Sequence, residues 1–216
     1  IPIIHVDYRI NTRMLQASRN MGNPIDTTQA EVAARKVNEK LESMLFTDTS
    51  YKFGGGTIYS YLNHPKRNSV SLSAAWTSLS ATSTQSVGEQ IIDDVISMKQ
   101  SAIDARQFGP YMLYIPTAYE TLLDKDYDTT RGNSIRSRIE AISGINGVKV
   151  VDTLPADNVL LVQMSTDTVR LVRGMGIQNV EWKSEGQFVN NYKVMTIQVP
   201  QIRADAEGKT GIVHLA

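Results

Sequence analysis

The sequence has no cysteine, no long apolar run and no excess of charge of either sign. The absence of cysteine excludes disulfide bonds, thiolate zinc sites and cysteine nucleophiles. Because no apolar run approaches the ~20 residues that span a bilayer, we expect no association with a membrane. Lys plus Arg number 22, as do Asp plus Glu, whereas dedicated nucleic-acid binders usually carry a basic excess. If this protein meets nucleic acid, we therefore expect it to act as a container and not as a reader of sequence.

The chain also lacks an initial methionine and a recognisable signal peptide. It begins in the strand-like run Ile1–Val6, whereas secretory signals combine a basic start with an apolar stretch. We expect a natural N-terminal portion to be missing or processed away.

The residues that are present have the composition of an ordinary globular protein, with 41% hydrophobic and 20% charged residues among 216. This length suits one large domain or two small ones. Capping boxes, in which a Ser or Thr precedes a Glu by three positions, predict helix starts at Thr28, Ser86 and Thr117. In the predicted helix 28–45, apolar residues form one thin stripe at helical spacing. We expect this helix to lie across a surface and not inside a core.

Strand patterns dominate the second half of the chain. A helix over 134–142 ends at Gly144, and runs rich in β-branched residues follow it. The glycines at 54–56 predict a flexible break, and the Ser/Thr-rich stretch 77–86 predicts a linker between lobes. The predicted strands of the second half are 148–151, 159–164, 168–172, 180–183, 192–199 and 212–215. Helices and strands segregated in this way indicate an α+β fold.

No sequence motif points to catalysis or to a cofactor. Gly208-Lys209-Thr210 is similar to the end of a phosphate-binding loop, but Arg203 stands where that motif needs its first glycine. The three histidines show no metal-ligand spacing, and no serine lies in a nucleophile elbow. We therefore predict no catalytic, cofactor-binding or metal-binding residues, and we expect that the protein is not an enzyme.

One acidic stretch superficially resembles a calcium-binding loop. Asp124, Asp126 and Asp128 alternate along it, but Thr129 and Ile135 replace the glycine and the bidentate glutamate of such loops. A solvated acidic loop is the better interpretation.

Several segments occur in an order that is typical of one protein family. They are Ile1–Asp7, Gly22–Thr28 leading into Ala30–Val37, Phe53–Tyr59 with Leu62–Pro65, Phe108–Tyr114, Leu160–Met164 and Val194–Asp205. In this order they resemble parts of the tailed-bacteriophage major capsid proteins of the Hong Kong 97 type, in the encapsulin-like branch. The parts are the returning strand of an extended loop, the entry to and exit from a spine helix, and strands of an axial lobe. Collinearity over essentially the whole chain carries the resemblance; the family's N-terminal arm and outgoing loop strand have no counterpart.

The resemblance implies an α+β fold of the Hong Kong 97 type, with a long spine helix, a peripheral sheet domain, an axial domain and an extended-loop strand. Residues 1–26 would form the extended-loop strand and its return. Residues 27–76 with 176–216 would form the peripheral domain, and residues 77–175 the axial domain.

The function that the resemblance implies is self-assembly into pentamers and hexamers of an icosahedral capsid around a phage double-stranded DNA genome. The location would be a virion assembled in the bacterial host cytoplasm. Partners would be further copies of the chain, portal and scaffold or decoration proteins, and packaged DNA in non-specific contact. No cofactor and no membrane are implied.

The resemblance also singles out two groups of residues. The loop that would line the capsomer centre contributes Asp124, Lys125, Asp126, Asp128 and Arg131. The extended-loop remnant contributes Ile1, Ile3 and Ile4, which we expect to reach a neighbouring subunit and not their own core. An ordinary surface loop stays open as the alternative for the first group.

Two alternative functions stay open. An encapsulin nanocompartment would use the same fold to enclose enzyme cargo instead of DNA. A small hydrolase with an unrecognised site would belong to a different class of protein altogether.

Overall fold

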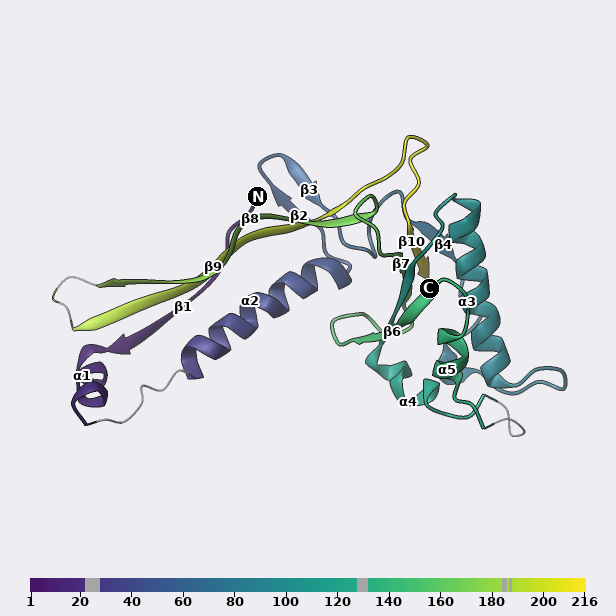
Figure 1. Cartoon of the computed structure of the whole chain (residues 1–216), viewed down its shortest axis with the longest axis horizontal. Helices are drawn as coiled ribbons and strands as arrows, with labels where there is room; N and C mark the ends of the chain where they lie inside the picture. Colours follow the sequence, from purple (N-terminus) through teal and green to yellow (C-terminus); the bar gives the residue numbers. More distant parts are fainter. Residues whose placement is uncertain (22–27, 128–131, 184–185, 187) are drawn as a thin grey trace. The chain divides into compact units, whose positions relative to one another are not determined.

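The computed structural model describes residues 1–21, 28–127, 132–183, 186 and 188–216 (Figure 1). Its helices and sheets confirm the predicted α+β class. The chain folds into two compact units. The first comprises Ile1–Ser43, Lys52–Gly56 and Leu171–Pro200, and the second comprises Met44–Tyr51, Thr57–Arg170 and Gln201–Ala216.

The first unit is built on a three-stranded sheet with the order β1-β9-β8. Its strands are β1 (Ile4–Asn11), β8 (Val169–Lys183) and β9 (Val189–Ile202). Strand β1 runs antiparallel to β9, from Ile4 opposite Thr196 to Asn11 opposite Val189. Half-buried and exposed residues alternate strictly along β1, which is the pattern of a strand with one covered face.

Helix α2 (Thr28–Phe46) covers one face of this sheet. Ala33 and Val37 of α2 pack with Val194 of β9 in one buried cluster, and Val6 and Tyr8 of β1 pack around them. Most other positions of α2 are partly or fully exposed. The helix predicted over 28–45 is therefore confirmed, together with its thin apolar stripe.

Three further short elements lie among the described residues before residue 60. Helix α1 (Thr12–Met21) follows β1, and β2 (Tyr51–Phe53) pairs with β3 (Gly56–Ile58). Gly54 and Gly55 adopt φ values of 56° and 80° in the connecting turn, which favour glycine. The glycines predicted to form a flexible break instead form a hairpin turn.

The second unit contains a five-stranded mixed sheet with the order β4-β10-β7-β5-β6. Its strands are β4 (Asn68–Val70), β5 (Tyr111–Pro116), β6 (Ile145–Val151), β7 (Val159–Gln163) and β10 (Ile212–Leu215). Strand β10 is parallel to β4 and antiparallel to β7, whereas β5 is antiparallel to β7 and parallel to β6. Every residue of β10 is buried, as expected for a strand with both faces covered.

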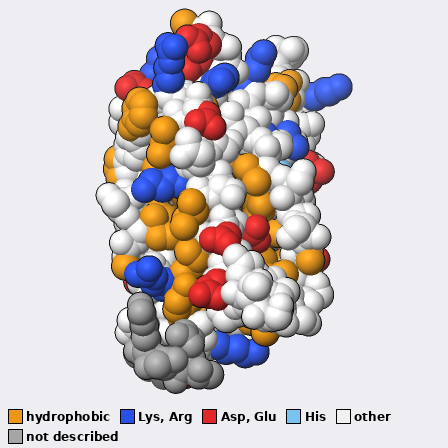
Figure 2. Space-filling model, turned by 90° about the vertical axis from the view of Figure 1, so that its right-hand side faces the viewer, with side chains coloured by type: hydrophobic (Ala, Val, Ile, Leu, Met, Phe, Trp, Pro, Cys, Tyr) orange, Lys and Arg blue, Asp and Glu red, His pale blue; other side chains and the backbone are white. Residues whose placement is uncertain are grey.

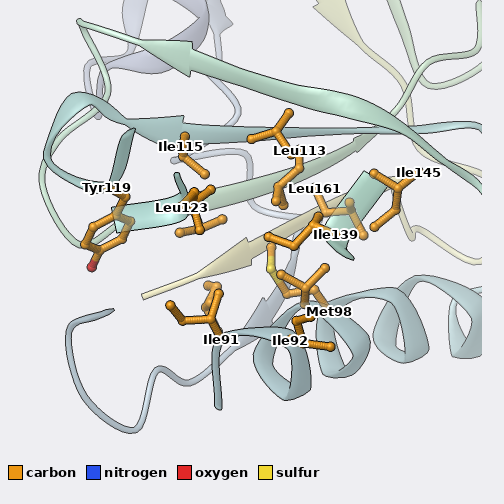
Figure 3. Close-up of a cluster of buried hydrophobic side chains, with 14 of the residues drawn as sticks. Ile91, Ile92, Met98, Leu113, Ile115, Tyr119, Leu123, Ile139, Ile145 and Leu161 are labelled. Carbon is orange, nitrogen blue, oxygen red and sulfur yellow. The ribbon is translucent and has the colours of Figure 1, made fainter. Parts of the chain in front are cut away.

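Apolar clusters cover both faces of this sheet. The helical elements of the unit are η1 (Trp76–Ser78), α3 (Val87–Asp104), η2 (Thr117–Tyr119), α4 (Glu120–Leu123) and α5 (Ile135–Glu140). On one face, Ile91 and Met98 of α3 pack with Leu113 of β5 and Ile139 of α5 (Figure 3). The second cluster contains Phe46, Tyr61, Leu62, Val151, Leu154, Leu160, Val162 and Ile212.

Some local predictions hold and others do not. The capping box at Ser86 is confirmed: its backbone N–H donates to Glu89 Oε2 at 2.7 Å, and its hydroxyl oxygen accepts from the Glu89 N–H at 3.2 Å. The capping box predicted at Thr117 is wrong, because η2 begins there after Pro116 without a side-chain cap. The strands predicted over 168–172 and 180–183 correspond to one strand, β8, which begins at Val169 and continues through the residues between them.

The stretch 77–86, predicted to link two lobes, lies inside the second unit. Trp76 precedes it and has no exposed surface. Its indole Nε1–H donates to Asp94 Oδ2 at 2.8 Å, and its ring stacks on Tyr119 with centroids 4.9 Å apart. The Tyr119 hydroxyl in turn donates to Asp157 Oδ1 at 2.7 Å. This anchored tryptophan ties the Ser/Thr-rich stretch to the core of the unit.

The Asp94 carboxylate generates a prediction for stability against pH. Burial raises the pKa of this carboxyl, the hydrogen bond from Trp76 opposes the rise, and the charge of Asp93 adds to it. Because the folded state then binds the proton more tightly than the unfolded chain, the free energy of unfolding should fall as pH rises through the raised pKa. Asp94→Asn is uncharged at every pH and should remove this fall, so its stability relative to the unaltered chain should be higher at pH 7 than at pH 3.

Urea unfolding at a series of pH values measures this difference. Asp167→Asn serves as the control, because the Asp167 side chain is 94% exposed, and it should change stability by no more than about 0.5 kcal/mol. A stability difference between Asp94→Asn and the unaltered chain that is the same at pH 3 and pH 7 would contradict the prediction.

Candidate functional site

The described residues contain no arrangement that suggests metal or membrane chemistry. Within those parts of the chain, no three His, Asp or Glu side chains form a group that could hold a metal ion. No helix in the described ranges is long and apolar enough to cross a bilayer. On the face shown in Figure 2, basic and acidic side chains are interspersed among apolar ones. This distribution differs from the single-sign basic stripe that is typical of nucleic-acid readers.

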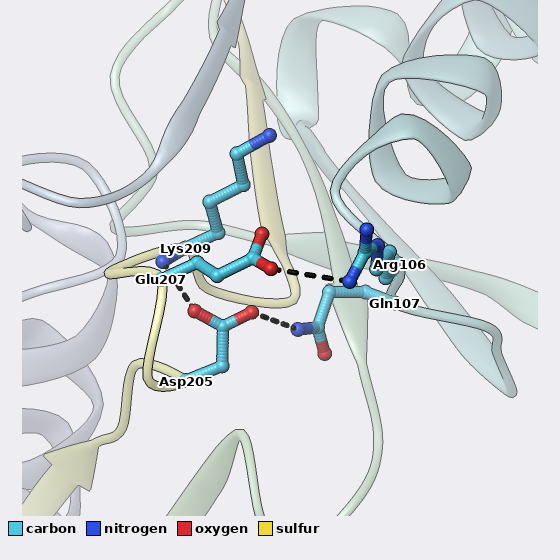
Figure 4. A network of polar contacts seen from close by, with 5 residues as sticks. All are labelled: Arg106, Gln107, Asp205, Glu207 and Lys209. Atoms are coloured by element: carbon cyan, nitrogen blue, oxygen red, sulfur yellow. Dashed lines mark hydrogen bonds and ion pairs between the residues drawn. The ribbon is translucent and has the colours of Figure 1, made fainter.

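A polar network joins the turn at 205–209 to the residues that follow α3 (Figure 4). Arg106 Nη1 donates to Glu207 Oε1 at 3.1 Å, and Gln107 Nε2 donates to Asp205 Oδ2 at 3.5 Å. The backbone N–H of Lys209 donates to Asp205 Oδ1 at 2.8 Å. Both carboxylates thus have partners within the chain, and strand β10 follows where a phosphate-binding loop needs a helix. The network therefore holds the turn at 205–209, which differs from a phosphate-binding loop in the element that follows it.

The loop predicted to line a capsomer centre is anchored where it leaves α4 and enters α5. Asp124 Oδ1 accepts from Arg136 Nε at 2.9 Å. The Lys125 carbonyl accepts from the N–H of Ile135 at 3.0 Å, and Asp126 forms an isolated antiparallel bridge with Ser134. The structure therefore holds Asp124, Lys125 and Asp126 on a fixed base. Asp128 and Arg131 lie outside the described residues.

Helix α3 supports the base of this loop through a glycine. A Cβ built on Gly88 would lie 2.9 Å from Tyr127 Cδ2 and 2.9 Å from the Tyr127 carbonyl oxygen. Those distances are shorter than carbon contacts allow, so only glycine permits this approach. The Ser86 hydroxyl also donates to the Tyr127 carbonyl at 3.4 Å. The loop base and the start of α3 therefore form one packed structure.

The three isoleucines predicted to reach a neighbouring subunit differ in their surroundings. Ile1 is 49% exposed and Ile3 is 54% exposed. Ile4, by contrast, is half buried and packs against the cluster of Ala33, Val37 and Val194. Ile4 thus contacts the core of its own unit, because side chains alternate along β1 and its side points toward α2. Of the three isoleucines, Ile1 and Ile3 keep large apolar surfaces exposed.

A further apolar surface in the first unit was not predicted from the sequence. Trp182 and Val180 of β8 are 42% and 43% exposed. Lys193 Nζ lies 5.5 Å from the centroid of the Trp182 ring and 3.7 Å from Asp7 Oδ1. The sheet face opposite to α2 carries Val180, Trp182, Lys193, Asp7, His5 and Met195. We call this face the open face. The alternation of Val180 and Trp182 with polar residues was a signal of such a face.

The close packing of Gly88 generates a second prediction. Gly88→Ala should lower the free energy of unfolding by about 1–3 kcal/mol, because the added methyl must displace Tyr127. Denaturant unfolding measures the loss. Gly176→Ala is the matched control, since a Cβ there meets nothing within 4 Å. Equal stability of Gly88→Ala and Gly176→Ala would show that the loop base is not held in this way.

Solved structures with the same fold include capsids and a virus-like particle. The chain is similar to a virus-like particle from Pyrococcus furiosus over 100% of its own length and 77% of that chain, with 20% identity and a TM-score of 0.74. It is similar to the capsid of Myoviridae phage XM1 over 100% and 73%, with 12% identity and a TM-score of 0.68. The capsid of an empty GTA particle matches over 99% and 70%, with 11% identity and a TM-score of 0.64. These likenesses confirm the Hong Kong 97-type fold.

The sequence itself matches one family. No curated protein is significantly similar to it. The profile of a family of unknown function, DUF6260, matches residues 1–215. The chain, with its capsid-type fold, therefore belongs to the DUF6260 family.

Proposed function

We propose that this protein is a structural shell subunit that assembles with its own copies into pentamers and hexamers of an icosahedral capsid. The observation that carries the proposal is the extent of the fold match, which covers 99% to 100% of the chain in the capsid and particle structures. A structural role, and not an enzymatic one, follows from the proposal.

The exposed apolar surfaces of the first unit support this proposal. A ring of identical subunits needs heterologous contacts, in which one surface of a copy meets a different surface of the next. Ile1, Ile3, Val180 and Trp182 each expose more than two fifths of their surface, and such groups gain stability when a partner removes them from water. The zero formal net charge also limits repulsion between copies.

The proposal keeps the three predicted regions and the acidic loop, with residues 1–26 as the extended-loop strand and its return. Residues 27–76 with 176–216 would form the wall as a peripheral domain, and residues 77–175 would form an axial domain at the symmetry axes. The boundaries of the two compact units differ from those of the predicted domains, since 57–76 and 201–216 pack in the same unit as 77–170. In this proposal the loop that starts at Asp124 surrounds the capsomer opening, where repeated charges set its electrostatic potential.

We propose that the shell encloses a phage double-stranded DNA genome, in a virion assembled in the bacterial host cytoplasm. Portal and scaffold or decoration proteins would be further partners. Contact with the packaged DNA would be non-specific, because the chain has no basic excess.

The second candidate is a nanocompartment shell that encloses enzyme cargo. Its support is the Pyrococcus furiosus virus-like particle, which has 20% identity and a TM-score of 0.74 with this chain, against 12% and 0.68 for the phage XM1 capsid. Both candidates use the same shell fold, so the enclosed material separates them. A small hydrolase is the remaining alternative from another class.

Electron microscopy and sedimentation of the purified full-length protein test the proposal. Closed shells are expected, and nuclease-resistant double-stranded DNA inside shells from the native source would identify a phage capsid. Co-purifying enzyme inside them would identify a nanocompartment. Small discrete oligomers under all assembly conditions would rule out a shell protein and favour the hydrolase.

The open face generates a prediction about assembly. Trp182→Glu should raise the protein concentration required for shell formation by roughly 30-fold or more, since an aromatic hot spot is worth about 2 kcal/mol or more at an interface. Light scattering against protein concentration measures this requirement, and circular dichroism checks that the subunit still folds. Trp182→Phe keeps an apolar ring and should assemble near the unaltered concentration. Unchanged assembly of Trp182→Glu would exclude the open face from the subunit contacts.

A further inference from the structure

Two of the three histidines are buried in the second unit, beside the C-terminal strand. His64 is 9% exposed and His214 is 8% exposed. His64 lies in the segment before β4, and His214 lies on β10. The third histidine, His5, is exposed on β1 in the first unit. Buried imidazoles need hydrogen-bond partners, and the partners of His214 come from two other segments of the chain.

The hydrogen bonds around His214 define which nitrogen carries its proton. Arg67 Nε donates to His214 Nδ1 at 3.2 Å, so Nδ1 must be the unprotonated acceptor. His214 Nε2 lies 2.6 Å from Asn158 Oδ1. Asn158 Nδ2 donates to the carbonyl of Ala156 at 2.8 Å, which orients the amide with its oxygen toward the imidazole. The site therefore holds a neutral imidazole with its proton on Nε2.

His64 is held in the same protonation state. Its Nδ1 accepts from the backbone N–H of Lys66 at 3.2 Å. Its carbonyl accepts from Arg67 Nη1 at 3.3 Å, so the guanidinium that contacts His214 also contacts the turn at His64. Tyr59 packs edge-on against the His64 ring, with centroids 5.5 Å apart.

These contacts join the edge of the sheet to its C-terminal strand. Strand β4 is an edge strand, and only three residue pairs join it to β10. Arg67 immediately precedes β4, and Asn158 immediately precedes β7. His214 thus connects the starts of the strands on both sides of β10. A second hydrogen bond joins β4 to the segment before β10: Asn68 Nδ2 donates to the carbonyl of Thr210 at 2.8 Å. This bond contains no titratable group.

Burial and the Arg67 cation oppose a further proton on either imidazole. Burial lowers the pKa of His214, the cation of Arg67 lowers it further, and Asp48 acts in the opposite direction. Burial and Arg67 also lower the pKa of His64. Protonation of His214 at Nδ1 would place an N–H against the Arg67 Nε–H at the present 3.2 Å separation. Two donors cannot share that contact, so the Arg67 bond must break.

We propose that His214 and Arg67 form an acid-sensitive latch that holds edge strand β4 against the C-terminal strand β10. At neutral pH the neutral imidazole accepts from the guanidinium and the latch is closed. In mild acid the protonated imidazole repels Arg67, and β4 separates from β10 more often. The turn at His64 contributes to the same response. This inference does not rest on the proposed shell function.

The direction of the pH dependence follows from the lowered pKa values. The opened edge binds protons with an ordinary histidine pKa near 6.5, whereas the closed edge binds them less readily. The closed state is therefore favoured above pH 6.5 and loses stability as pH falls below it. For one histidine, the equilibrium between closed and open states can shift by up to about tenfold between pH 7.5 and pH 5.5.

Hydrogen exchange of the whole chain tests the latch. Protection of the amides of 68–70 and 212–215, corrected for the intrinsic pH dependence of exchange, should fall by up to about tenfold between pH 7.5 and pH 5.5. His214→Asn keeps an oxygen that can accept from Arg67 and cannot titrate, so it should flatten this fall. His5→Gln, which removes the exposed histidine, should leave the fall unchanged.

A measurement on the unaltered chain makes the test independent of whether the His214→Asn variant folds. Long-range nitrogen–proton NMR spectra of the imidazoles should show the His214 proton on Nε2 at pH 7.5 and a titration midpoint for His214 below the ordinary histidine value near 6.5. A proton on Nδ1 would overturn the proposal. So would protection at 68–70 and 212–215 that falls no more than that of β1, the reference strand in the first unit.

Discussion

The burial of strand β7 on both of its faces is the constraint around which the second unit is built. Val159 and Leu161 point into the cluster that contains α3, and Leu160 and Val162 point into the cluster of Phe46 and Tyr61. All four side chains are fully buried, and each such burial contributes about 1.5–3 kcal/mol. A strand that is apolar on both sides must lie inside a sheet with covered faces. The positions of β5 and β10 beside it, and of the helices over it, follow from this requirement.

The first unit satisfies the same requirement on one face only. Helix α2 buries the side of the sheet that carries Val194, whereas Val180 and Trp182 keep large exposed surfaces on the other side. An apolar surface of this kind is typical of a subunit contact in an assembly. The two units therefore differ in packing: the second unit completes its own core, whereas the first keeps an exposed apolar surface, which the proposed assembly would cover.

The polar side chains discussed above that enter the core of the second unit each have a hydrogen-bond partner there. Trp76 donates to Asp94, and Tyr119 donates to Asp157. His214 is held between Arg67 and Asn158. A buried polar group without a partner costs about 1–3 kcal/mol, so each of these contacts constrains the segment that supplies it. The same contacts make the unit sensitive to pH, because a proton added to His214 removes the acceptor on which one of them depends.

Local patterns in the sequence determined the elements whose signals are local. The apolar stripe of 28–45 became α2, the capping box at Ser86 starts α3, and the continuous apolar run at 159–162 became the buried strand β7. Collinear segments also determined the Hong Kong 97-type fold, which the similar structures confirm. The sequence did not decide between a break and a regular element at two places that contain glycine. Gly54 and Gly55 form a hairpin turn and not a flexible break, and β8 runs unbroken past Gly174 and Gly176.

Only the tertiary structure decided which side chains meet across long separations in the chain. The sequence places Arg67 and His214 147 positions apart, and nothing local to either residue indicates that one donates to the other. Likewise, the three isoleucines at the start looked equivalent, but strand alternation and the position of α2 bury Ile4 partly and leave Ile3 exposed. The physical reason is the same in both cases. Composition and periodicity determine which side chains are stabilised by burial or by a hydrogen-bond partner. The order of strands in a sheet and the face that a helix covers determine which of these side chains become buried or paired.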